Sequence, residues 1–123
     1  MVMYALLLAT GIQVSGCPAT IQDTQVVAVS TGWDVRIEKR PRLLERVTVY
    51  SGEPSRRRSL QPVPGKNGSS IWGFAGENIW IECRYSDSAA VLIKNLGVVK
   101  SCSFEPAEGG TSNPARVTCE KKK

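Results

Sequence analysis

The chain has 123 residues, a formal net charge of +5 and no histidine. This length allows one small domain rather than two. The lack of histidine excludes Ser-His-Asp and Cys-His catalysis and removes the commonest zinc ligand. The chain has no run of basic residues interleaved with aromatic residues, which is the pattern that would indicate a nucleic-acid partner. We therefore expect no cofactor, no metal and no nucleic acid, and the positive charge favours an anionic partner.

The N-terminal residues 1–16 have the pattern of a secretory signal. They carry no charge, and an apolar core over Tyr4–Ala9 is followed by small and polar residues up to Gly16. The apolar stretch is shorter than the roughly 20 residues that span a bilayer. We predict a signal peptide over 1–16 and a single β domain over 17–123, located in the periplasm. No basic residue precedes the apolar core, so we expect the natural start to lie upstream.

The four cysteines are Cys17, Cys83, Cys102 and Cys119. In an oxidising compartment this even number predicts two disulfides, and the lack of C-x-x-C spacing argues against a redox or zinc site. Three connectivities exist, and we expect Cys17–Cys119 and Cys83–Cys102. Alternatively, Val14–Cys17 resembles a lipobox, in which Cys17 would carry a lipid and tether the protein to a membrane. That alternative would leave one thiol without a partner.

Short β-strands separated by turn residues dominate the chain. The first three are predicted over Gln25–Val29, Trp33–Ile37 and Leu43–Tyr50, and Arg40–Arg46 is the one helix candidate. Next, Ile71–Phe74 and Ile79–Tyr85 are expected to form a β-hairpin. Further strands are predicted over Val91–Ile93, Val98–Phe104 and Arg116–Cys119. The fold class is all-β, a small antiparallel sandwich or barrel of about eight short strands in a meander. Trp33, Trp72 and Trp80 are expected in its core.

The sharpest charged feature is the run Arg56, Arg57, Arg58, in a segment rich in proline and glycine. Arginine binds carboxylates through a planar fork, and loops on a rigid scaffold commonly carry binding residues. We predict that a partner contacts this loop, and the expected contact residues are Glu53, Arg56, Arg57, Arg58, Lys66 and Asn67. The pairs Glu77 with Glu82 and Glu105 with Glu108 are candidates for glycosidase chemistry. We interpret them as surface charges and expect no enzyme activity.

Several short motifs together resemble a family of small exported proteobacterial proteins. They are Cys17–Ile21, a turn at Tyr50–Pro54, Leu60–Pro62 and Ile79–Tyr85, in that order. Some family members lie beside type VI secretion genes, and the resemblance implies an immunity or inhibitor protein. Its partner would be a peptidoglycan-degrading effector, a glycosidase or an amidase, whose active site it blocks. The alternative is an envelope structural or ligand-binding lipoprotein with no enzyme partner.

Overall fold

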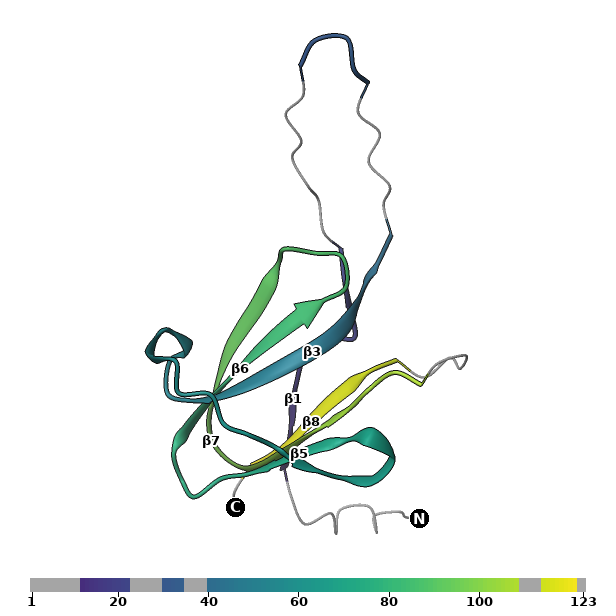
Figure 1. Cartoon of the computed structure of the whole chain (residues 1–123). Helices are drawn as coiled ribbons and strands as arrows, with labels where there is room; N and C mark the ends of the chain where they lie inside the picture. The colour runs from purple at the N-terminus through teal and green to yellow at the C-terminus, as the bar shows by residue number, and fades with distance from the viewer. Residues whose placement is uncertain (1–11, 23–29, 35–39, 109–113, 122–123) are drawn as a thin grey trace, which may run out of the picture.

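The computed structural model describes residues 12–22, 30–34, 40–108 and 114–121 (Figure 1). Eight strands follow one another in this part of the chain: β1 (Ile12–Ser15), β2 (Thr20–Ile21), β3 (Arg42–Ser51), β4 (Val63–Pro64), β5 (Ser70–Gly73), β6 (Asn78–Tyr85), β7 (Val91–Glu105) and β8 (Arg116–Lys121). All their pairings are antiparallel. The predicted all-β antiparallel fold is therefore confirmed, and most of the helix candidate at Arg40–Arg46 lies in β3 instead.

The long strand β7 belongs to two layers. Its first half pairs with β6, which pairs with β3, whereas its second half lies between β5 and β8. Gly97 lies where β7 leaves β6, in the left-handed region with φ 75°. Only glycine enters this region without steric cost, so Gly97 permits the irregularity at this crossing. The strand order runs from β1 through β8, β7, β6 and β3 to β2, and the sheet does not close on itself.

The predicted hairpin of β5 with β6 is wrong. Both strands pair with β7, one after the other: Trp72 lies opposite Cys102, and Ile81 opposite Lys94. Between the two strands, the Phe74 amide donates to the carbonyl oxygen of Lys100 at 3.1 Å. This bond holds the connecting segment beside β7, so the chain continues along β7 and does not turn back.

The core lies between the two layers, and strand alternation supplies it. Its buried residues are Leu44, Val47, Val49, Trp72, Ile79, Ile81, Cys83, Tyr85, Leu96, Val99, Cys102, Ala115, Val117 and Cys119. Trp72 is buried as predicted, and Trp80 is half-buried. Trp33 is 74% exposed, so its predicted place in the core is wrong. It follows the turn at Thr31–Gly32 and lies outside the strands.

The two predicted disulfides are present, but their predicted partners are wrong. The bonds join Cys17 to Cys83 and Cys102 to Cys119. Cys102 and Cys119 lie directly opposite each other on β7 and β8, with their Cα atoms 4.0 Å apart. Because a disulfide joins residues whose Cα atoms lie close together, this strand register decides the pairing. The two remaining cysteines, Cys17 and Cys83, form the other bond, and Cys83 lies on β6 in the neighbouring layer.

The N-terminal segment contributes an edge strand, β1, to β8. Gln13 lies opposite Glu120, and Ser15 opposite Thr118. These residues fall within the predicted signal peptide, so cleavage after Gly16 would remove β1 and leave both disulfides in place. The predicted strand over Gln25–Val29 lies outside the described residues, as does 35–37 of the strand predicted over Trp33–Ile37.

Candidate functional site

The arginine run forms an exposed turn at the end of β3, which we call the basic turn (residues 53–58). The Ser51 amide donates to the Arg58 carbonyl at 3.0 Å, and the Gly52 amide donates to the Asn78 carbonyl at 2.8 Å. Arg57 has a left-handed backbone, with φ 57°. All three arginine residues and Glu53 are exposed. The turn therefore has a hydrogen-bonded base and presents its arginines to solvent.

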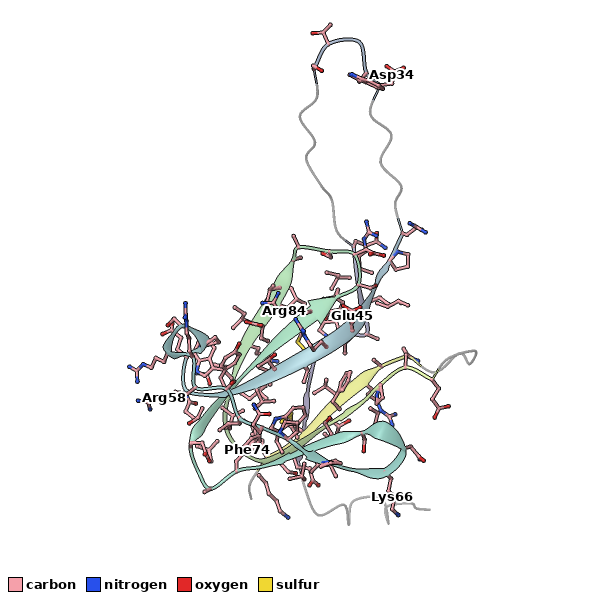
Figure 2. All side chains as sticks on the ribbon, viewed as in Figure 1. Asp34, Glu45, Arg58, Lys66, Phe74 and Arg84 are labelled. Carbon is pink, nitrogen blue, oxygen red and sulfur yellow. A yellow bond between two sulfur atoms is a disulfide. The ribbon has the colours of Figure 1, made fainter. Side chains whose placement is uncertain are left out.

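Lys66 and Asn67 lie in a second turn, between β4 and β5. The Gly65 amide donates to the Ser69 carbonyl at 2.8 Å, and Asn67 has φ 55°. Figure 2 shows Arg58 at the left and Lys66 at the lower right, well separated from each other. The structure thus brings Glu53 and the three arginines together, but it places Lys66 and Asn67 in a separate group.

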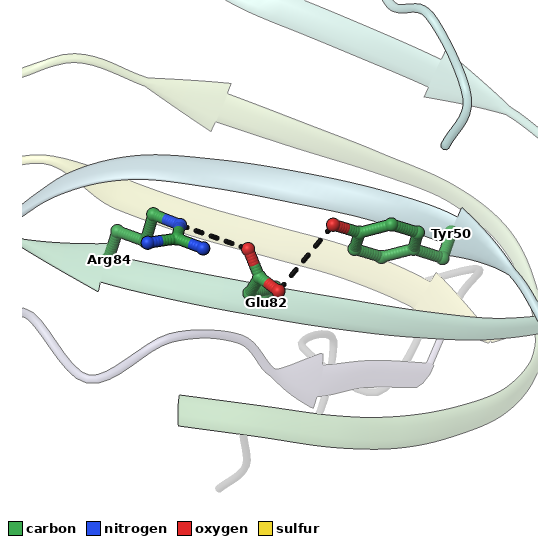
Figure 3. Close-up of polar contacts among 3 residues, drawn as sticks. All are labelled: Tyr50, Glu82 and Arg84. Carbon is green, nitrogen blue, oxygen red and sulfur yellow. Dashed lines mark hydrogen bonds and ion pairs between the residues drawn. The ribbon is translucent and has the colours of Figure 1, made fainter. Parts of the chain in front are cut away.

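A polar cluster on the outer face of β3 and β6 was missed by the sequence reasoning (Figure 3). The Nε atom of Arg84 donates to Glu82 Oε1 at 3.0 Å, and the Tyr50 hydroxyl donates to Glu82 Oε2 at 3.5 Å. Glu82 is 8% exposed and is the one buried charged residue in the described part of the chain. Burial, and then the Glu82 charge, raise the pKa of Tyr50. Glu82 is therefore held between a cation and a hydroxyl.

Arg46 extends this cluster, because the strand register places it opposite Arg84. Both guanidinium groups counteract the rise in the Tyr50 pKa, so they act on the same site. Trp80 lies opposite Tyr50, and Tyr50 forms a β-bridge with Ser59, the residue that follows the basic turn. We call Arg46, Tyr50, Trp80, Glu82 and Arg84 the arginine face. It adjoins the basic turn through Tyr50.

The two carboxylate pairs do not have the features of a glycosidase site. Glu77 accepts a hydrogen bond from the Ala75 amide at 2.6 Å, and such backbone bonds lower its pKa. A general acid needs the opposite shift. Glu82 is engaged by Arg84, and Glu105 accepts a bond from Arg116 Nη2 at 2.6 Å. These contacts fit structural and surface roles.

A shallow groove of about 280 Å³ follows β3 beside the arginine face. It is lined by Arg46, Thr48, Leu60 and Pro62, among others. The indole nitrogen of Trp72 donates to the Leu60 carbonyl at 3.1 Å and fixes this segment against the core. Among the residues that the structure places, no group of three or more Cys, Asp or Glu could hold a metal ion.

The comparison with known protein families gives a match. The model of the family described as type VI secretion system Tli immunity protein matches residues 38–120. No curated protein and no solved structure matches the chain. Within the described ranges, no helix is long and apolar enough to cross a membrane. The family match includes the basic turn, the arginine face and three of the four cysteines, and it confirms the predicted link to type VI secretion immunity. Since it spans more than half of the sequence, this chain belongs to the Tli immunity protein family of the type VI secretion system.

Proposed function

We propose that this protein binds an effector toxin and blocks its active site, and so protects the cell that produces it. The match to an immunity family over residues 38–120 carries this proposal. The surface supports it: an exposed basic turn projects from a sheet that two disulfides brace. A rigid scaffold lowers the entropy lost on binding, because little needs to be ordered in the complex.

The proposed location is the periplasm, after removal of residues 1–16. Both disulfides fit an oxidising compartment. The sulfur of Cys17 is bonded to Cys83, and a lipid attached to the same sulfur would exclude that bond. We therefore propose that Cys17 is disulfide-bonded rather than lipidated in the mature protein.

The proposed target is a peptidoglycan hydrolase, either a glycosidase or an amidase. A glycosidase cleft contains a pair of carboxylates, and arginine recognises carboxylates well. Arg56, Arg57 and Arg58 are the proposed contacts to such a cleft, together with Glu53. Because Lys66 and Asn67 lie elsewhere, they would contact a separate part of the effector.

The test uses the mature protein from the periplasm and the effector encoded beside its gene. Binding is measured by calorimetry, and hydrolysis of peptidoglycan and of phospholipid vesicles is measured with and without the immunity protein. We expect a one-to-one complex and loss of peptidoglycan hydrolysis. Inhibition of lipid hydrolysis alone would retain the immunity function and overturn the target class. If the effector neither binds nor loses activity, the immunity proposal fails and the lipoprotein alternative takes its place.

A further inference from the structure

The arginine face holds two like charges directly opposite each other. Arg46 and Arg84 occupy paired positions on β3 and β6. Like charges at such positions destabilise a sheet, whereas opposite charges stabilise it. The buried Glu82 contacts Arg84 at 3.0 Å, and no ion pair of Arg46 is present among the described residues. The two arginines thus lie on one face with a single contacting carboxylate, that of Glu82, which Arg84 engages.

The guanidinium of Arg84 is only partly used within the protein. Its contact to Glu82 uses Nε, and the side chain is 45% exposed while that of Glu82 is 11% exposed. In the part of the chain that is described, no ion pair or hydrogen bond involves its terminal nitrogen atoms. Arginine binds a carboxylate in a bidentate manner through such N–H groups. Arg84 is therefore oriented from within by Glu82 and remains open to a second carboxylate from outside.

Glu45 does not fulfil this role within the protein. It precedes Arg46 at the irregularity between Leu44 and Arg46, and it is exposed. No ion pair joins it to either arginine in the described structure. Among the residues that the structure describes, Arg46 therefore has no ion-pair partner.

The neighbouring side chains suit a protein partner. Tyr50 and Trp80 lie opposite each other beside the two arginines, and both are half-buried. Tyrosine, tryptophan and arginine are the residues that most often dominate the energy of protein interfaces. Ile93, opposite Glu82 on β7, is 52% exposed and adds apolar surface to this face.

We infer that an acidic side chain of the effector docks between Arg46 and Arg84, with the aromatic rings of Tyr50 and Trp80 packing beside it. The inference rests on the proposed function, and it names a contact that the basic turn does not supply. The incoming carboxylate lies between the two positive charges and reduces their repulsion. This favourable interaction forms only in the complex.

The test is Arg46→Glu in the mature protein, measured by calorimetry with the effector and by thermal unfolding. We expect Kd to rise roughly 30-fold or more, as for the loss of a buried interfacial charge pair. We expect the melting temperature to stay equal or to rise, because glutamate opposite Arg84 replaces repulsion by attraction. A residue with a merely structural role would not weaken binding while leaving stability intact.

The matched control is Lys100→Glu, which makes the same charge change at an exposed position of β7. We expect its Kd to stay within about threefold of the wild-type value. Any change in this control reports the long-range effect of net charge on association. Arg46→Ala is the second variant, with an expected loss of about tenfold. If wild type binds and both Arg46 variants bind within threefold of it, the inference is overturned while the immunity function stands. If wild type does not bind, both proposals fail.

Discussion

The two faces of β6 differ in burial and in polarity. The inner face presents Ile79, Ile81, Cys83 and Tyr85, each at most 3% exposed. The outer face presents Trp80, Glu82 and Arg84, a ring, a buried carboxylate and a half-exposed cation. Adjacent residues of this strand therefore lie in different environments, the core or the outer surface, because successive side chains point to opposite sides of a sheet.

This difference separates stability from recognition. The inner face consists of close-packed apolar groups and a disulfide, which add to the free energy of unfolding. The outer face retains Arg46 opposite Arg84, and like charges at paired positions are expected to lower the free energy of unfolding. Natural proteins keep unfavourable local arrangements chiefly at functional sites. The inner face thus provides the core of the fold, and the outer face is the proposed binding surface.

The largest expected effect is the loss of stability when a disulfide is removed. Cys17–Cys83 closes a loop of 66 residues, and Cys102–Cys119 closes one of 17. Replacing the first pair by serine should lower the free energy of unfolding by about 4 kcal/mol, and the second pair by about 3 kcal/mol. Urea denaturation of the two double variants measures both values. A larger loss from the second pair would contradict the loop-length argument.

The next effect concerns the buried carboxylate that links the two faces. Glu82→Gln should lower the free energy of unfolding by about 2 kcal/mol, since it removes a charged hydrogen bond to Arg84 and one to Tyr50. The control Glu45→Gln, at an exposed position of β3, should change it by less than about 0.5 kcal/mol. Equal losses in the two variants, measured by urea denaturation, would show that Glu82 has no special role.

A smaller substitution on the inner face tests whether folding and binding depend on different faces of β6. Ile81 is fully buried, so Ile81→Val should lower the free energy of unfolding by about 1 kcal/mol through the lost methyl group. The affinity for the effector should not change. If the folded variant bound the effector more weakly than the wild type, the inner face would also contribute to binding.

The smallest expected effect is a loss of stability in alkali. Burial raises the pKa of both Tyr50 and Tyr85 above the usual value of about 10. A raised folded-state pKa adds stability that is fully present below the unfolded-state value and is lost as pH rises through the folded-state value. Melting temperatures between about pH 8 and 11 should therefore fall at the alkaline end. The double variant with Tyr50→Phe and Tyr85→Phe should show a smaller fall.

Strand alternation predicted much of the inner face. Alternation along the predicted strand Ile79–Tyr85 puts Ile79, Ile81, Cys83 and Tyr85 on the same side, and all four are buried in the structure. The disulfide partners were predicted wrongly, because they depend on which strands are neighbours. The hairpin was predicted wrongly for the same reason: the turn before Asn78 carries the chain along β7, and only the long-range pairing decides this.

The candidate site was predicted less completely. The exposed arginine turn follows from local composition, and Arg56, Arg57 and Arg58 are exposed as expected of a binding loop. The arginine face needed the register that brings Arg46 opposite Arg84, and residues 38 apart in sequence carry no local sign of it. The alternation on each strand was visible, but the pairing was not.

The division between the faces is tested most directly by footprinting of the complex. Hydroxyl-radical oxidation of Tyr50 and Trp80 is measured by mass spectrometry in the free immunity protein and in its one-to-one complex with the effector. The account predicts that both side chains, half-exposed in the free protein, are oxidised much more slowly in the complex. Unchanged oxidation of both residues in a fully formed complex would contradict it, since the effector would then bind elsewhere.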